Sequence, residues 1–270
     1  MRQCKTVRVD TSSRSYDVVV GAETLDDLGP LMGSACAHRS AFVVSDSNVA
    51  PLYLERALAS LAEAGFEADT VTIPAGEQHK TLVTFGRILE AMAEAELTRD
   101  AVVVALGGGV VGDMAGFAAA CYMRGIDVVQ VPTTLLSMVD SSVGGKTAID
   151  LSAGKNLVGA FLQPSLVLAD VSTLATLDAE VFADGMGEVV KHGVLADKAL
   201  FEDLAARPVL PDGDPARLIE VVARNVAIKR DVVNADERER GLRQTLNLGH
   251  TIGHAIEAAS NYRLGHAVSV

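Results

Sequence analysis

Two histidines, His250 and His254, stand four residues apart in the run LRQTLNLGHTIGHAIEAAS. Apolar residues recur at helical spacing across 243–260, which predicts a helix, and positions i and i+4 lie on one face of a helix. Arg243 and Asn247 precede the histidines at the same spacing. The pattern predicts one stripe of a basic, an amide and two imidazole groups, suited to an anion site beside a metal. The alternative is a pair of half-exposed histidines on a solvated face.

A glycine-rich turn follows the apolar run AVVVAL (101–106) and precedes an apolar helical stretch. Gly107, Gly109 and Gly112 match the G-x-G-x-x-G pattern, in which backbone N–H groups at a helix N-terminus face a dinucleotide pyrophosphate. The usual acidic residue closing a second strand about 20 residues later is absent, and Asp113 lies just inside the helix instead. A tight strand-to-helix turn without a ligand is the alternative.

The segment 131–161 is dense in polar residues that a core would not select. Gly144 and Gly145 allow a close backbone approach to a ligand, and Lys146 adds a positive charge. The spacing is not that of a Walker P-loop. The other polar residues of this segment are Thr133, Thr134, Asp140, Lys155 and Asn156. The segment is either a ligand-binding loop or a flexible surface loop.

Glu188 and Lys191 lie three residues apart in GMGEVVKHG, on one face of a helix that is otherwise apolar. A glutamate on a core-facing helix needs a metal or another cation as its partner. Together with His250 it forms a plausible oxygen and nitrogen ligand pair for zinc. The alternative is an ordinary Glu–Lys pair on the surface.

The overall composition narrows the class of protein. The chain has 270 residues, of which 49% are hydrophobic and 4% aromatic, so it can bury a large core of Ala, Val and Leu. The net charge of −12 argues against nucleic acid as a partner, although it does not exclude a small anionic substrate. Apolar runs are only strand-sized and the N-terminus lacks a signal-peptide core, so we expect no membrane association. The three unpatterned cysteines favour a reduced, cytoplasmic protein.

Short β-rich runs alternate with helical runs up to about residue 177, which predicts an α/β layer with a largely parallel sheet. The expected strands are 6–9, 16–20, 41–45, 69–73, 101–106 and 127–131, and the clearest helices between them are 50–64 and 81–97. The first two strands should form an antiparallel hairpin at one edge. After about residue 178 we expect only helices, at 180–196, 198–206, 214–233 and 243–260.

Taken together, these runs resemble the 3-dehydroquinate synthase family over nearly the whole chain. The matching segments are AGEQHKT (75–81), GGGVVGDMAGF (107–117), RGIDVVQVPTTLLSMVDSSVGGKTAID (124–150), GKNLVGAF (154–161), GMGEVVKHG (185–193) and DERERGLRQTLNLGHTIGHAIEA (236–258). The resemblance implies an α/β N-terminal NAD-binding domain, here 1–177, and an all-α C-terminal domain, here 178–270. The site of the family lies in the cleft between the two.

The resemblance also implies roles for individual residues. Positions that hold NAD in the family are Asp46, Glu77, Lys80, Gly107, Gly108, Gly109, Asp113, Thr133, Thr134, Lys155 and Thr176. Positions that contact the substrate are Asp140, Lys146, Asn156, Lys191, Lys229, Arg243, Asn247 and His254. Arg124 falls on a phosphate contact supplied by the neighbouring subunit, which implies a homodimer. Glu188 and His250 fall on ligands of a divalent metal, zinc or cobalt, whereas His254 lies by the substrate phosphate.

The third metal ligand is where this sequence departs from the family. The family has a His-Gly-x-Ala-Val run about 16 or 17 residues after its first histidine, and this chain reads Leu264-Gly265-His266-Ala267-Val268. Counting residues puts His266 in the ligand position, whereas aligning Gly and Ala-Val puts Leu264 there and leaves no ligand. A three-ligand site needs a third donor, so we favour His266.

The resemblance implies conversion of the anionic sugar phosphate 3-deoxy-arabino-heptulosonate 7-phosphate to 3-dehydroquinate and phosphate, in the shikimate pathway. NAD would take up and return hydride, and the metal would act as a Lewis acid. The chain stops at Val270, whereas the family continues with several more helices that include a further lysine near the substrate. We therefore expect a shortened form of a longer protein, or an incomplete coding sequence, with little activity.

Three alternatives remain open. The first is another sugar-phosphate cyclase, making valiolone-type or deoxy-inosose rings, against which Asn247 and His254 argue. The second is a protein like glycerol dehydrogenase, against which the VDSSVGGK and GKN runs argue. The third is a non-catalytic NAD-binding fragment, because the shortened helical domain would not complete the site.

Overall fold

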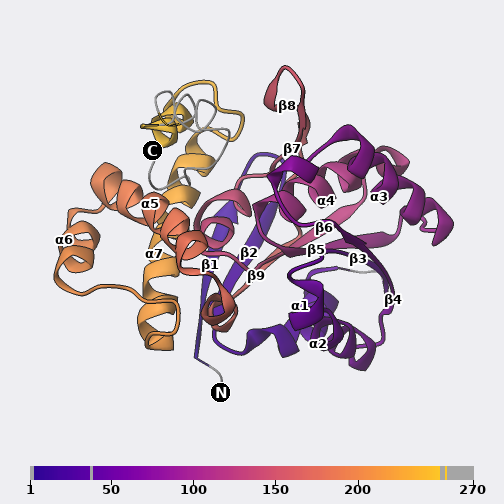
Figure 1. Cartoon of the computed structure of the whole chain (residues 1–270), viewed down its shortest axis with the longest axis horizontal. Coiled ribbons are helices and arrows are strands. Elements are labelled where there is room, and N and C mark those ends of the chain that lie inside the picture. The colour runs from indigo at the N-terminus through magenta and orange to yellow at the C-terminus, as the bar shows by residue number, and fades with distance from the viewer. Residues whose placement is uncertain (1–2, 37–38, 250–252, 254–270) are drawn as a thin grey trace.

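The computed structural model describes residues 3–36, 39–249 and 253. Its main sheet has seven strands in the order β1-β2-β9-β6-β5-β3-β4 (Figure 1). The strands are β1 (Cys4–Asp10), β2 (Ser15–Gly21), β3 (Ser40–Asp46), β4 (Glu67–Ile73), β5 (Ala101–Gly107), β6 (Asp127–Pro132) and β9 (Leu166–Asp170). All pair in parallel except β1, which pairs antiparallel with β2. The predicted edge hairpin is therefore confirmed.

Helices cover both faces of the sheet, which explains why its central strands are apolar at consecutive positions. Phe42 and Val44 of β3 face α3 (Leu82–Glu94) and α4 (Gly109–Cys121). Ala41 and Val43 of the same strand face α1 (Leu28–Ala35) and α2 (Ala50–Glu63). Successive strand residues point to opposite faces, so one strand contributes to two cores. Figure 1 shows the two helix pairs on opposite sides of the sheet.

The second half of the described chain is helical, as predicted. Its helices are α5 (Ala179–Ala196), α6 (Lys198–Ala206) and α7 (Pro215–Ala235). Apolar residues of α7, such as Val222 and Val226, share one core with Val18 and Val20 of β2. This core crosses the predicted domain boundary at 177/178. None of the helices within the described ranges combines the length and apolarity needed to cross a bilayer.

The sequence analysis missed three strands. β7 (Lys146–Leu151) and β8 (Gly154–Phe161) form an antiparallel hairpin that projects from the body of the molecule in Figure 1. Their sequences are rich in glycine and polar residues, so the period-2 pattern of a strand is weak. β9 is a short run between β2 and β6, and all of its residues are buried.

The predicted helix over 243–260 does not form over 243–249. Residues 242–247 form a short 3-10 helix, Leu248 lies in a turn with a non-helical ψ of 128°, and Gly249 has a φ of 83°. The Asp236 carboxylate accepts backbone N–H groups of Gly241 and Arg243, at 2.8 and 3.1 Å, and this competes with α-helical hydrogen bonding. Arg243 and Asn247 therefore do not share a helical stripe, because Arg243 is buried and Asn247 is exposed. Gly253 is helical, as predicted, and donates its N–H to the Gly249 carbonyl oxygen at 2.9 Å; residues 250–252 and 254–260 lie outside the described residues.

Candidate functional site

Predicted NAD contacts follow the carboxyl ends of the parallel strands. Asp46 ends β3, Gly107 ends β5, and Thr133 follows β6. From β3 the chain proceeds to β4 on one side, while β5 lies on the other, so the strand order reverses between β3 and β5. A crevice at such a reversal is the usual ligand site of an open α/β sheet. Asp46 and Gly107 flank it.

The glycine turn is tightly enclosed. A Cβ added to Gly107 would lie 2.6 Å from Cγ2 of Val111, and one added to Gly108 would lie 3.1 Å from Cγ2 of Thr134. A Cβ on Gly109 would lie 3.2 Å from Oγ of Ser141. The turn opens α4, whose first N–H groups have no partner within the helix. Backbone donors that glycine leaves uncovered at a helix N-terminus fit a pyrophosphate.

Lys80 joins the turn to the β7–β8 hairpin. Its Nζ lies 2.6 Å from Oδ2 of Asp113 on α4 and 2.5 Å from Oδ1 of Asn156 on β8. Asp150 of β7 donates its N–H to the Lys80 carbonyl oxygen and accepts the N–H of Asn156. Burial raises the pKa of Asp113, and the Lys80 ammonium opposes this. The structure thus brings two predicted NAD contacts, Lys80 and Asp113, to a predicted substrate contact, Asn156.

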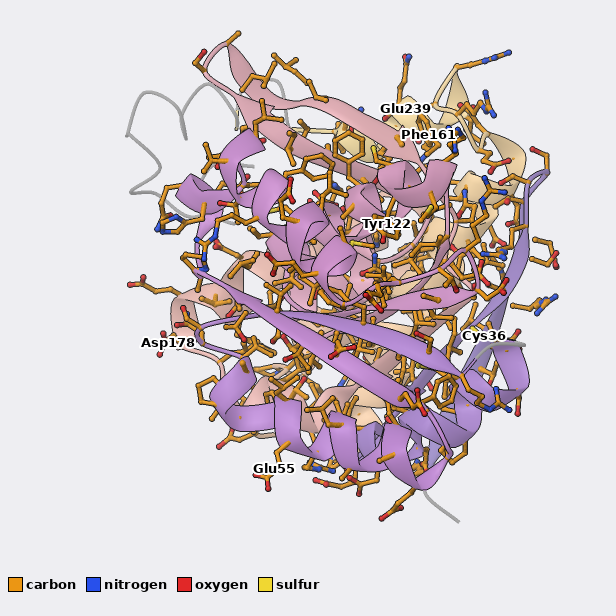
Figure 2. The ribbon with its side chains drawn as sticks, turned by 90° about the vertical axis from the view of Figure 1, so that its right-hand side faces the viewer. Cys36, Glu55, Tyr122, Phe161, Asp178 and Glu239 are labelled. Atoms are coloured by element: carbon orange, nitrogen blue, oxygen red, sulfur yellow. The ribbon has the colours of Figure 1, made fainter. Side chains whose placement is uncertain are left out.

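A cavity of about 590 Å³ lies beside this group. The predicted substrate contacts that line it are Asp140, Lys146, Asn156, Lys229 and Arg243. A smaller pocket shares Asp140, Lys146, Lys229 and Arg243 and adds Lys191 and Asn247. Figure 2 shows Phe161 and Glu239, which also line the cavity, at the upper side of the molecule. The predicted substrate contacts on described residues therefore each line one of two pockets that share Asp140, Lys146, Lys229 and Arg243.

The cavity holds buried charges. Nζ of Lys229 lies 2.6 Å from Oδ1 of Asp140 and also donates to the Asp140 carbonyl oxygen. Burial works to raise the pKa of Asp140, but Lys229 and other nearby cations outweigh it, and the pKa lies well below its ordinary value. Burial lowers the pKa of Lys229 and of Arg243. Cations held under such cover bind anions more strongly than exposed ones, because little water screens them.

Glu188 and Lys191 form an ion pair in which both side chains are less than one-tenth exposed. The alternative of an ordinary surface pair is therefore wrong. A ring nitrogen of His192 and carboxylate oxygens of Asp140 and Glu188 lie within 4.8 Å of one another. Burial lowers the pKa of His192, which favours the neutral imidazole that can donate a lone pair. Two carboxylates and a neutral imidazole fit a divalent cation.

Two residues of this region were not selected from the sequence: Glu239, which lines both pockets, and His192, which is buried and lines neither. His192 is part of the quoted run GMGEVVKHG, four residues after Glu188, and this i, i+4 spacing was the available signal. Glu239 lies in the charged run DERERG, which reads as a solvated face. Its carboxylate lies 2.5 Å from Nζ of Lys146 and accepts the Nδ2–H of Asn247 at 3.0 Å. Only the fold brings it into the site.

Other predicted site residues lie around this centre or away from it. Lys155 and Glu77 form an ion pair at 3.4 Å. Thr176 hydrogen-bonds the Tyr53 hydroxyl at 2.7 Å, and Thr134 bonds to Ser137. Arg124 is exposed after α4 and lines neither pocket. His250, His254 and His266 lie outside the described residues.

Comparison with known proteins places the chain in a family. The profile described as 3-dehydroquinate synthase N-terminal matches residues 70–184, and the C-terminal profile matches 185–270. A 3-dehydroquinate synthase of Symbiobacterium thermophilum is 52% identical over 265 residues, which is 97% of this chain and 74% of that protein. The chain belongs to the 3-dehydroquinate synthase family. The resemblance drawn from its motifs is therefore confirmed.

Solved structures agree with this family assignment. A 2-deoxy-scyllo-inosose synthase complexed with carbaglucose-6-phosphate, NAD+ and Co2+ has a TM-score of 0.89 and 28% identity, covering 97% of this chain and 73% of that one. A 2-epi-5-epi-valiolone synthase from Streptomyces hygroscopicus with NAD+ and Zn2+ bound has a TM-score of 0.86 and 32% identity, covering 96% and 72%. The predicted fold class is confirmed. Both cyclases are less similar in sequence than the 3-dehydroquinate synthase above.

Proposed function

We propose that this member of the 3-dehydroquinate synthase family converts 3-deoxy-arabino-heptulosonate 7-phosphate to 3-dehydroquinate and phosphate. The observation that carries the proposal is the cavity beside the glycine turn, where Lys146, Lys229 and Arg243 meet Asp140 and Asn156. The substrate carries a carboxylate and a phosphate, and three basic residues line this hollow in a protein of net charge −12.

NAD and one divalent metal, zinc or cobalt, are the proposed cofactors. The glycine turn, Lys80 and Asp113 would hold NAD, and Glu188 would hold the metal together with His250 and His266. Bound NAD supplies a hydride acceptor and bound metal a Lewis acid. The chain's own residues orient the substrate beside these groups, because misplacement by about 1 Å can cost about 100-fold in rate.

The cations that line the cavity differ in solvent exposure, which suggests that they bind different parts of the substrate. Lys229 is buried and its ammonium is fixed by Asp140, whereas the Lys146 side chain is 44% exposed and pairs with Glu239. We assign Lys229 and Arg243 to fixing one anionic end of the substrate in place. Lys146 and Asn156 would engage the other end as it enters. In this scheme Glu239 holds Lys146 in position until an anion replaces it.

We also propose that the active form is a homodimer in which Arg124 reaches the site of the partner subunit. Arg124 is exposed and lines neither pocket of its own chain. Met123, Arg124 and Gly125 have consecutive φ values of 49°, 71° and 118°, so a strained turn presents this side chain outward. Equilibrium sedimentation and an Arg124→Ala variant test this part of the proposal.

A phosphate-release assay with the heptulosonate phosphate tests the function. Because the chain spans 74% of the length of the Symbiobacterium relative, the assay compares the 270-residue chain with one extended by the remaining C-terminal residues of that relative. We expect the extended chain to release phosphate with catalytic amounts of NAD and to lose this activity on metal chelation. Absence of release from the extended chain would refute the proposal. Release with a hexose 6-phosphate instead would identify the chain as a sister cyclase.

A further inference from the structure

Tyr16 is a buried tyrosine of the edge hairpin whose hydroxyl reaches the segment that leads into β7. It lies on β2 with its surface only 1% exposed, and its hydroxyl accepts the Gly144 N–H at 3.1 Å. Gly144 is also buried, and β7 begins two residues later at Lys146. Burial raises the pKa of Tyr16 to about 12, so at neutral pH the hydroxyl contributes a hydrogen bond and no charge.

The turn formed by Gly144 and Gly145 needs support from outside. Their φ values are 96° and 68°, in the left-handed region that glycine enters without steric cost but with a large loss of conformational entropy on folding. The Gly145 carbonyl oxygen accepts the Leu162 N–H at 2.8 Å, and the Tyr16 hydroxyl fixes the other end of the turn. Without that acceptor a buried N–H would be left unpaired, which favours a different arrangement of the peptide.

The guanidinium of Arg243 packs directly against this turn. A Cβ added to Gly144 would lie 2.4 Å from Nη2 of Arg243, so only glycine allows so close an approach. Arg243 is itself 2% exposed. Because protein interiors are closely packed, movement of the Gly144 peptide would displace the guanidinium.

The second support of Arg243 leads back to the same hairpin. Nη1 of Arg243 donates to the Glu237 carbonyl oxygen at 2.6 Å. The Glu237 carboxylate in turn accepts the hydroxyl groups of Ser12 and Ser13, which lie in the turn between β1 and β2. Both supports of the guanidinium therefore depend on the edge hairpin, although that hairpin lines neither of the two pockets.

We propose that Tyr16 is a positioning residue for substrate binding: by holding the Gly144 peptide, its hydroxyl keeps the guanidinium of Arg243 where it meets one anionic end of the substrate. This inference rests on the proposed function, which assigns Arg243 to such an end. Tyr16 lines neither pocket, so it acts only through these neighbours.

Tyr16→Phe keeps the ring, removes the hydroxyl and tests the inference in two ways. The first is nuclear magnetic resonance of the 270-residue chain labelled with 15N-arginine, in which the guanidinium signals of Arg243 are assigned by their loss in Arg243→Lys. These signals should shift and broaden in Tyr16→Phe. The second is kinetics in the extended chain, where KM for the heptulosonate phosphate should rise about 10-fold and kcat should change by less than about 3-fold, because Arg243 binds the substrate before the reaction as well as during it.

Ser60→Ala is the matched control, because the buried Ser60 hydroxyl of α2 also accepts a glycine N–H, that of Gly29 at 3.0 Å. It should lower thermal stability and leave the Arg243 signals, KM and kcat unchanged. Unchanged Arg243 signals in Tyr16→Phe, or an unchanged KM, would overturn the inference. Absence of turnover in the unmodified extended chain would refute the proposed function, and the resonance measurement, which needs no substrate, would still decide whether Tyr16 positions Arg243.

Discussion

Nζ of Lys229, on α7, lies 2.6 Å from Oδ1 of Asp140, in the segment that follows β6. This ion pair connects the helical half of the chain to the α/β half inside the cavity, and the Lys229 side chain is only 6% exposed. Two functions therefore fall on the same pair. It holds two parts of the fold together, and it fixes a cation where an anionic substrate would lie.

Lys229→Met should lower the free energy of unfolding by about 3 kcal/mol, because it leaves the Asp140 carboxylate without its cation. Lys229→Met combined with Asp140→Asn should be more stable than Lys229→Met alone, since no uncompensated charge remains. Urea denaturation at neutral pH measures both. If the double variant loses as much stability as the two single variants together, the pair is not coupled.

Gly109→Val should lower NAD affinity at least about 10-fold. The new side chain would begin 3.2 Å from Oγ of Ser141 and cover the N-terminus of α4. Gly86→Ala is the control, because a Cβ at this position of α3 meets no atom within 4 Å. Titration calorimetry with NAD compares the two variants. If the unmodified chain, Gly109→Val and Gly86→Ala bind NAD with equal affinity, the glycine turn does not contact NAD and serves only in packing.

In the extended chain, Lys146→Ala should lower kcat/KM in the phosphate-release assay by about 100-fold, because it removes a cation that lines the substrate cavity. Lys198→Ala provides a control on α6, where the lysine side chain is 86% exposed and pairs only with Glu202 in the described structure. It should retain full activity. A normal kcat/KM in the Lys146→Ala variant would show that Lys146 does not contribute to substrate binding or catalysis.

The Glu237 carboxylate should make the free energy of unfolding depend on pH. Burial works to raise its pKa, but hydrogen bonds from Ser12, Ser13 and Gln163 outweigh it and lower the pKa to about 2. The ionised form is thus favoured in the folded state, so its stabilisation is complete above an unfolded pKa of about 4.3 and is lost as the pH falls toward 2.

Glu237→Gln should therefore be about 1 kcal/mol less stable than the unmodified chain at pH 7 and nearly equal to it near pH 2. Denaturation curves across this range measure the difference. A stability difference that stays constant from pH 7 to pH 2 would contradict the assigned hydrogen bonds.

The sequence predicted those parts of the fold that rest on local patterns. Strands such as β5 are uniformly apolar because both faces of the sheet are covered, and helices such as α7 have regular apolar spacing. The β7–β8 hairpin was missed because its residues serve contacts to Lys80 and the cavity, and not a strand face. The 3-10 helix at 242–247 was missed because the competing acceptor, Asp236, acts through side-chain hydrogen bonds that periodicity does not report.

For the site, the sequence motifs predicted which residues belong to it better than they predicted which side chains those residues contact. Asp140, Lys146, Asn156, Lys229 and Arg243 were predicted from the family resemblance and meet at one cavity. Glu239 and His192 were not selected, because a charged run and a lone histidine have common structural explanations. Their importance follows only from contacts across the fold, such as the Asn225–His192 hydrogen bond between two helices.

The apolar core that joins α7 to β1 and β2 determines how cooperatively this protein should unfold on heating. Val7, Val18, Val222 and Val226 belong to one cluster with Tyr16, whose buried hydroxyl accepts the Gly144 N–H at 3.1 Å. The helical half thus cannot separate without exposing the side of the sheet that it covers. Cooperativity should therefore extend across the whole described chain, with one calorimetric transition whose measured enthalpy equals the van't Hoff enthalpy.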